Sequence, residues 1–185
     1  MPPKAIPEPW QSFLKELDGT LTEEFPFHCM GGFVVTLLHG LPRPTSDIDV
    51  LSLVTTDERF RALVELGGDG SALHKKHGVY LDCVSVANVP DSYVERLSEM
   101  FPGTLKHLRL FALDPYDLAL SKLERNIQRD RDDVKHLART VPLDLAVLQQ
   151  RYREEMRPYL GRPEREDLTL KLWIEAIEEN RQAAR

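Results

Sequence analysis

Cysteine is scarce in this sequence. Cys29 and Cys83 are the only two, and no C-x-x-C motif is present. Disulfide-stabilised scaffolds and zinc ribbons need more cysteines than this, so both classes are excluded. Both residues lie in apolar runs, and we expect them to be buried thiols.

Long apolar runs are also absent. No segment approaches the ~18 consecutive apolar residues of a membrane helix, so we expect no membrane partner. The first seven residues, M-P-P-K-A-I-P, lack the apolar stretch of a secretory signal. This start predicts a cytoplasmic protein.

An excess of positive charge is missing as well. The chain has 24 Lys and Arg against 30 Asp and Glu, a net charge of −6. Strong non-specific binding to nucleic acid depends on many cationic contacts to phosphates, and this balance argues against it. A local basic face is still compatible with such a balance.

The sequence does have the composition of a soluble globular protein. Of its 185 residues, 42% are hydrophobic and 29% are charged, enough for one core with a helical annex. Strand and helix patterns mix over the first ~115 residues, and helical patterns alone follow. We expect strands at 25–30, 47–54, 79–86 and 105–112. We expect helices at 10–18, 57–66, 92–100, 130–140, 143–156 and 164–182, and a further helix begins after Asp114. The segment 33–39 fits a helix or a strand, and 74–77 is expected to be a solvated loop.

The most informative stretch is G-G-F-V-V-T-L-L-H-G-L-P-R-P-T-S-D-I-D-V, from Gly31 to Val50. Asp47 and Asp49 lie two apart on an expected strand, so their side chains share one face. Carboxylates this close repel each other unless a cation lies between them, and oxygen ligands suit Mg²⁺ or Mn²⁺. A D-x-D pattern alone is common, and an exposed pair at the start of a strand is the alternative.

Two further features accompany this pair. Gly31 and Gly32 precede the segment 33–39, and glycines let a backbone approach an anion closely; an ordinary turn is the alternative. Asp82 lies inside the second apolar strand, where a carboxylate is costly unless it is paired or binds a metal. A surface-facing Asp82 on a half-exposed strand explains that residue equally well.

Taken together, these motifs resemble the nucleotidyltransferase superfamily typified by DNA polymerase β. The longer pattern G-G…G-x-x-R-x-T-x-D-I-D is similar to a narrower branch, the bacterial nucleotidyltransferase toxins of abortive-infection and toxin–antitoxin systems. The residues that carry this pattern are Gly31, Gly32, Gly40, Arg43, Thr45, Asp47 and Asp49.

The resemblance extends into the helical part and covers roughly residues 26–139. Lys122, in D-P-Y-D-L-A-L-S-K-L-E-R, matches the lysine of that branch, and R-D-R-D-D-V supplies its acidic pair, Asp130 and Asp133. Two plainer interpretations remain open. Asp130 fits a helix N-cap with Asp133 as its capping partner, and Lys122, Arg125 and Arg129 fit a solvated basic stripe.

The resemblance implies an α+β fold. A small mixed β-sheet forms a nucleotidyltransferase core with helices packed on it, followed by a helical C-terminal subdomain. We expect the chain to divide into an N-terminal extension and helix, the core and the helical subdomain, at residues 1–24, 25–113 and 114–185.

The resemblance also implies a mechanism and partners. Asp47, Asp49 and Asp82 would hold Mg²⁺ or Mn²⁺, with Lys122 as a further catalytic residue. A nucleoside triphosphate would be bound by Gly31, Gly32, Arg43, Thr45 and Lys122, with Asp130 and Asp133 as additional site residues. The acceptor would be RNA, at the 3′ end of tRNA, and a cognate antitoxin protein would be a partner.

Two alternatives keep this fold and change the function. The first is a nucleotidyltransferase acting on a small molecule such as an antibiotic, for which the acidic balance would suit a cationic acceptor. The second is a catalytically idle protein that binds a nucleotide or a partner.

Overall fold

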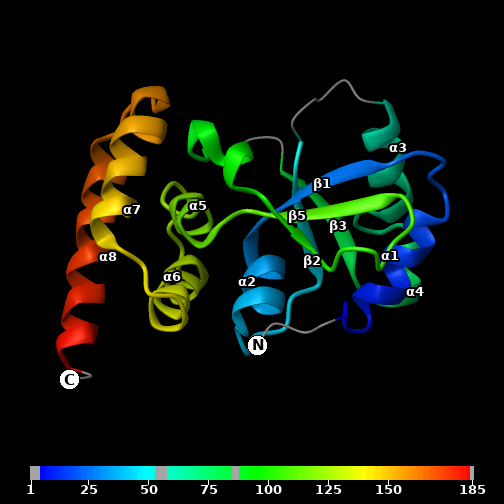
Figure 1. Ribbon diagram of the computed structural model, residues 1–185, viewed down its shortest axis with the longest axis horizontal. Helices are drawn as coiled ribbons and strands as arrows, with labels where there is room; N and C mark the ends of the chain where they lie inside the picture. The colour runs from blue at the N-terminus through cyan, green and yellow to red at the C-terminus, as the bar shows by residue number, and fades with distance from the viewer. Residues whose placement is uncertain (1–4, 53–57, 85–87, 184–185) are drawn as a thin grey trace. The chain divides into compact units, whose positions relative to one another are not determined.

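The computed structural model is shown in Figure 1. It describes residues 5–52, 58–84 and 88–183. The expected strand ends at Val54 and Val86, and the expected helix start at Asp57, lie outside this range. No helix within it combines the length and the apolarity needed to cross a membrane.

The chain forms two compact units. The first consists of Met1–Ala87 and Leu97–Leu113, and the second of Asn88–Arg96 and Asp114–Arg185. The segment Asn88–Arg96 therefore clusters with the C-terminal helices, although a stretch of the first unit separates it from them in sequence.

A mixed five-stranded sheet forms the centre of the first unit, as expected for an α+β core. Its spatial order is β3-β2-β1-β5-β4, with parallel pairs β2–β3 and β1–β5 and antiparallel pairs β1–β2 and β4–β5. The strands are β1 (Phe25–Cys29), β2 (Asp47–Leu51), β3 (Tyr80–Val84), β4 (Ser98–Met100) and β5 (Leu108–Ala112).

The central strands are held in register by apolar side chains. On β5, Leu108, Leu110 and Ala112 are at most 2% exposed and alternate with half-buried residues, which is the period of a strand with one buried face. β1 runs parallel to β5, with Phe25 opposite Leu108. A shift of one residue would turn the buried set to the other face, so burial fixes this pairing.

Among the described residues of the same unit, four segments form helices. They are α1 (Trp10–Asp18), α2 (Gly31–His39), α3 (Glu58–Gly67) and α4 (Ala72–His77). Phe13 and Leu17 of α1 are fully buried, and Phe60 of α3 stacks on Phe25 with 6.3 Å between ring centroids. The ambiguous segment 33–39 is thus helical.

Two expectations, for residues 74–77 and 92–100, were wrong. Residues 74–77 belong to α4, because Ser71 caps that helix by accepting a hydrogen bond from His74 N (3.0 Å) and Leu73 is buried. Residues 92–100 do not form one helix. They divide into a short 3₁₀ segment and the edge strand β4, which gains backbone pairing with β5.

The second unit is helical, as the sequence predicts. Its elements are η1 (Asp91–Arg96), α5 (Pro115–Leu120), α6 (Gln128–Thr140), α7 (Leu145–Arg151), η2 (Tyr152–Met156), η3 (Arg157–Tyr159) and α8 (Glu164–Ala183). The start of α5 shows why helices form here: Asp114 caps it by accepting from Asp117 N (2.9 Å), and Pro115 occupies the first turn.

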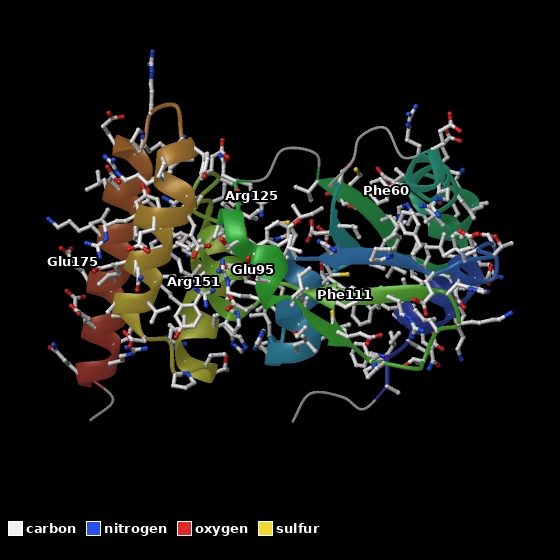
Figure 2. The ribbon with its side chains drawn as sticks, turned by 45° about the horizontal axis from the view of Figure 1, so that its top comes forward. Phe60, Glu95, Phe111, Arg125, Arg151 and Glu175 are labelled. Carbon is white, nitrogen blue, oxygen red and sulfur yellow. The ribbon has the colours of Figure 1, made fainter. Side chains whose placement is uncertain are left out.

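Charged contacts connect the segment Asn88–Arg96 to these helices. Arg96 donates to both oxygens of the fully buried Asp117, at 2.9 and 3.1 Å. Arg151 of α7 donates to Asp117 at 3.0 Å and points toward the interior of this unit (Figure 2). Burial raises the pKa of Asp117, while the two guanidinium groups oppose that rise.

Candidate active site

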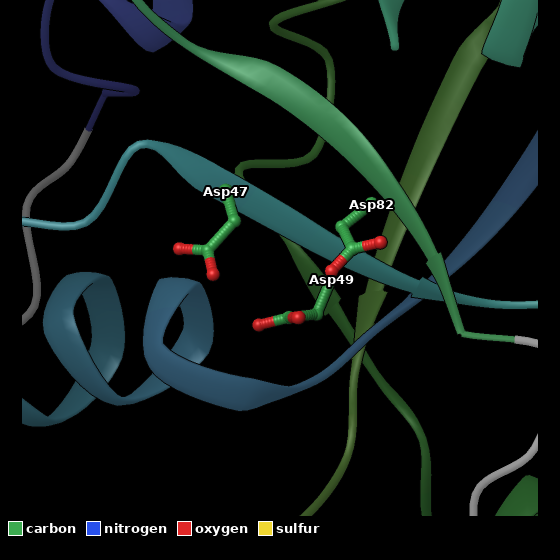
Figure 3. A group of neighbouring side chains, drawn as sticks. All are labelled: Asp47, Asp49 and Asp82. Atoms are coloured by element: carbon green, nitrogen blue, oxygen red, sulfur yellow. The ribbon is translucent and has the colours of Figure 1, made fainter. Parts of the chain in front are cut away.

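Three aspartates converge on one face of the sheet in the first unit (Figure 3). Asp47 and Asp49 project from β2, and Asp82 projects from the neighbouring strand β3. One carboxylate oxygen from each can be chosen so that all three atoms lie within 4.8 Å of one another. The structure therefore brings Asp82 to the Asp47–Asp49 pair, although the sequence placed it on a different strand.

Strand register produces this convergence. β2 and β3 run parallel, with Asp49 directly opposite Asp82. Ile48 and Val50 alternate with the aspartates and are at most 2% exposed, so the apolar side of β2 is fixed in the core. The carboxylates consequently have to lie on the opposite, accessible side.

The turn from β1 into α2 lies directly against this carboxylate group. Gly31 begins α2 with φ = 66°, a left-handed conformation that favours glycine. A Cβ on Gly31 would lie 1.8 Å from Asp49 Oδ2. In addition, Met30 N donates to the backbone oxygen of Asp49 at 3.0 Å, which ties the turn to β2.

The N-terminus of α2 offers backbone N–H groups beside the carboxylates. Met30 is its N-cap and provides no side-chain hydrogen bond to the first turn. The first N–H groups of a helix lack intrahelical partners and favour anions. An acidic cluster next to an anion-binding helix end suits a ligand that combines a divalent cation with phosphate.

Arg43 and Thr45 complete this surface of the first unit. A Cβ on Gly32 would lie 3.4 Å from Thr45 Oγ1 and 3.6 Å from an Arg43 guanidinium nitrogen, so both side chains flank the first turn of α2. Thr45 Oγ1 donates to Asp47 Oδ1. Thr45 thereby orients one of the three carboxylates.

The donor set fits a hard divalent cation. Three carboxylates without nitrogen or sulfur donors match the oxygen ligands that Mg²⁺ and Mn²⁺ prefer. Mg²⁺ is commonly bound through a few carboxylates together with substrate phosphates. Asp47, Asp49 and Asp82 are thus the residues of this unit that could hold such an ion.

The negative charge of this cluster affects neighbouring groups. Burial raises the pKa of the fully buried Cys29 thiol, and the Asp49 carboxylate raises it further. Burial likewise raises the pKa of Tyr80, with contributions from Asp47 and Asp82. Tyr80 faces Asp47 across β2 and β3 and packs on His74, with 4.7 Å between ring centroids.

Tyr80 was not identified from the sequence as part of this surface. The signal that would have found it is the parallel register of β2 and β3, which no local motif encodes.

The remaining expected site residues lie in the second unit. Lys122 is 5% exposed, and its Nζ lies 2.7 Å from Asp133 Oδ2 and 3.5 Å from Asp130 Oδ1. Arg125 also binds Asp130, with donor–acceptor distances of 2.7 and 2.9 Å. Burial opposes the ionisation of Asp130, but Arg125 and Lys122 outweigh it and lower the pKa of that carboxyl.

These contacts overturn the two plainer interpretations of this segment. Lys122 does not belong to a solvated stripe, because both carboxylates enclose it. Asp130 is not the N-cap of α6: Ile127 holds that position, and Asp130 accepts a hydrogen bond from Ile127 N at 3.2 Å.

One comparison with known proteins gives a match. Residues 11–181 match a family model described as "Nucleotidyltransferase of unknown function (DUF6036)". No curated protein and no solved structure matches the chain significantly.

Proposed function

We propose that this chain, which belongs to the DUF6036 family of nucleotidyltransferases of unknown function, transfers a nucleoside monophosphate from a nucleoside triphosphate to RNA. The observation that carries the proposal is the convergence of Asp47, Asp49 and Asp82 beside the glycine turn of α2. The specific acceptor, the 3′ end of tRNA, and a toxin-like role with a cognate antitoxin rest on the resemblance of the G-G…D-I-D motif.

Asp47, Asp49 and Asp82 would hold Mg²⁺ or Mn²⁺. When bound there, the divalent cation supplies Lewis acidity, lowering the pKa of the acceptor hydroxyl and stabilising negative charge on the phosphates. Thr45 keeps Asp47 oriented through its hydroxyl hydrogen bond. Asp82, the most exposed of the three carboxylates, would accept the proton of the incoming hydroxyl.

The first turn of α2 would bind the triphosphate. Gly31 and Gly32 carry no side chains there, so their N–H groups can approach phosphate oxygens closely. Arg43 flanks the same turn and would neutralise the charge that develops on the leaving group. The acceptor oxygen forms a bond to the α-phosphorus as the bond to the β-phosphate oxygen breaks, and pyrophosphate leaves.

We keep three residues of the second unit as site residues because the family resemblance implies that role: Lys122, Asp130 and Asp133. Their mutual contacts favour a role in positioning: the buried ammonium group and its two carboxylates fix the start of α6 against the residues that follow α5. A direct contact of Lys122 with phosphate would require it to leave Asp133.

A transfer assay tests the proposal. The chain is incubated with each of the four α-³²P-labelled triphosphates, Mg²⁺ or Mn²⁺, and total RNA, and products are separated by size. We expect label on a tRNA-sized band for at least one triphosphate. Parallel reactions that replace the RNA with a panel of aminoglycosides test the small-molecule alternative.

Matched variants identify the site. Asp49→Asn keeps the shape of the side chain and removes one ligand charge, so we expect transfer to fall at least about 100-fold. Asp91→Asn changes an exposed aspartate of the second unit and should leave transfer intact. Label on an aminoglycoside would redirect the proposal to a small-molecule acceptor, and label that persists in Asp49→Asn would overturn the site.

A further inference from the structure

An exposed apolar pair on α8 has no role in nucleotidyl transfer as proposed above. Leu168 and Leu172 are 57% and 53% exposed, although they lie on a 20-residue helix whose other side is well buried. Four residues apart, they occupy the same face. Single exposed leucines are ordinary, but two adjacent ones beside a hollow indicate a contact surface.

The hollow lies between α6 and α8 within the second unit. Thr169, Leu172, Trp173, Ala176 and Ile177 line one side of it, and its volume is about 290 Å³. A second hollow of about 460 Å³ continues it toward the end of α8, and the two share Lys135 and Ile177. Together they form one groove along the two helices, here called the α6–α8 groove.

This groove is positively charged in an acidic protein. Its cationic residues are Arg131, Lys135, Arg139 and Arg181. Among the described residues, no Asp or Glu lines either hollow, although the chain carries a net charge of −6. An apolar floor with a cationic rim fits an amphipathic helix that carries leucines and carboxylates.

α8 is itself such a helix, because its exposed face carries both leucines and carboxylates. Leu168 and Leu172 lie on it together with Glu164, Glu175 and Glu179, all exposed. Glu175 points outward from α8, away from α7 (Figure 2). Arg165, Leu168, Leu172, Glu175 and Glu179 follow one another at spacings of three and four residues, which is the spacing of a coiled-coil seam.

We propose that the α6–α8 groove binds α8 of a second copy of this chain, in a two-fold symmetric, antiparallel pair centred on Leu172. A two-fold interface uses the same surface on both copies, and this surface is complementary to itself. Residues equally far on either side of Leu172 then face each other. Leu168 of one copy covers Ala176 in the groove of the other, and Arg165 faces Glu179.

The same register brings opposite charges together. Glu164 of the second copy faces Asn180, next to the cationic end of the groove formed by Lys135, Arg139 and Arg181. The two-fold symmetry gives the dimer two Arg165–Glu179 pairs. The leucines provide apolar burial at the centre, and the charges fix the direction and register of the helices.

The mass of the full chain in solution tests this proposal, without reference to transfer activity. Sedimentation equilibrium at increasing concentration should give twice the chain mass of 21.2 kDa at about 50 µM. Leu172→Glu places a charge at the centre of the interface and should weaken association at least about 30-fold. Val94→Glu is the matched control, since Val94 is 52% exposed, and it should leave association unchanged.

Charge reversal tests the register. Arg165→Glu and Glu179→Arg should each weaken association, because each variant puts like charges opposite one another at both symmetric copies of this contact. The double variant Arg165→Glu/Glu179→Arg restores both pairs and should recover association. Circular dichroism confirms that each variant is folded. A monomer throughout the concentration range, equal effects of Leu172→Glu and Val94→Glu, or no recovery in the double variant would each overturn the proposal.

Discussion

The carboxylate of Asp49 occupies the space that a side chain on residue 31 would need. A Cβ on Gly31 would lie 1.8 Å from Asp49 Oδ2 and 2.6 Å from its carboxyl carbon. The glycine turn and the D-x-D strand are separated in sequence by residues 33–46, yet they form one site in the structure. The absence of a side chain at residue 31 is what allows Asp49 to reach its place beside Asp47 and Asp82.

Substitution of the two glycines should have different effects. Gly31→Ala introduces both the clash with Asp49 and an alanine at φ = 66°, so we expect a loss of more than about 2 kcal/mol in the free energy of unfolding. Gly32→Ala adds a Cβ at ordinary contact distance in a helix, and stability should stay within about 1 kcal/mol of the original. Chemical denaturation measures both. Equal losses of unfolding free energy for the two variants would contradict the claim that a Cβ at residue 31 clashes with Asp49.

Lys122 should be important for stability. Lys122→Met keeps most of the side-chain volume but leaves the buried carboxylates Asp130 and Asp133 without their shared cation, so we expect a loss of about 3–5 kcal/mol. Lys75→Met, at an exposed position, should change stability by less than about 0.5 kcal/mol. Thermal and urea unfolding compare the two. If the Lys122→Met variant is as stable as the original chain, Lys122 does not stabilise the fold, and its role would be contact with a ligand alone.

Asp18 should make stability depend on pH. Burial opposes its ionisation, but the N–H groups of Leu108, Lys106 and His107, at 2.7 to 2.9 Å, lower its pKa below the ordinary 3.8. Because the pKa of Asp18 is lower in the folded state than in the unfolded state, its ionised carboxylate stabilises the fold at pH values above the unfolded-state pKa. This contribution is lost as the pH falls through the folded-state pKa.

Asp18→Asn measures this contribution. At neutral pH it should lower the free energy of unfolding by about 1–3 kcal/mol, because an amide cannot accept these hydrogen bonds as strongly. The difference from the original chain should shrink as the pH falls below about 3.8. Asp91→Asn is the exposed control. A difference that does not vary with pH would rule out the ionised carboxylate as its source.

The two cysteines should react at different rates. Cys29 is fully buried, and burial together with Asp49 raises the pKa of its thiol, so little reactive thiolate forms. Cys83, on the same sheet, is half-buried. A thiol reagent at neutral pH should modify Cys83 first, and Cys29 only after unfolding, as peptide mass spectrometry would show. Rapid modification of Cys29 in the folded protein would contradict the packing of β1.

Local patterns in the sequence predicted much of this structure. The alternation in D-I-D-V and V-Y-L-D-C-V identified β2 and β3, and Asp114 with Pro115 identified the start of α5. Such signals are contained within a few residues. That Asp82 reaches Asp47 and Asp49 was implied only by the family resemblance, because the convergence depends on the parallel pairing of β2 with β3, which no local pattern encodes.

The errors have the same origin. The pattern of residues 92–100 fits a helix, but pairing with β5 makes its last part a strand. The basic stripe inferred from Lys122, Arg125 and Arg129 ignored two carboxylates that tertiary packing places around Lys122. The contacts of Arg96 with Asp117 join residues 21 positions apart and carry no local signature.

Binding of Mn²⁺ tests the central claim, that Asp47, Asp49 and Asp82 form one metal centre for nucleotidyl transfer. Electron paramagnetic resonance counts free Mn²⁺ during a titration of the chain with a non-hydrolysable triphosphate analogue. We predict saturable binding that Asp49→Asn weakens at least about tenfold and Asp91→Asn leaves unchanged. Absence of binding, or equal binding by all three proteins, would contradict the claim.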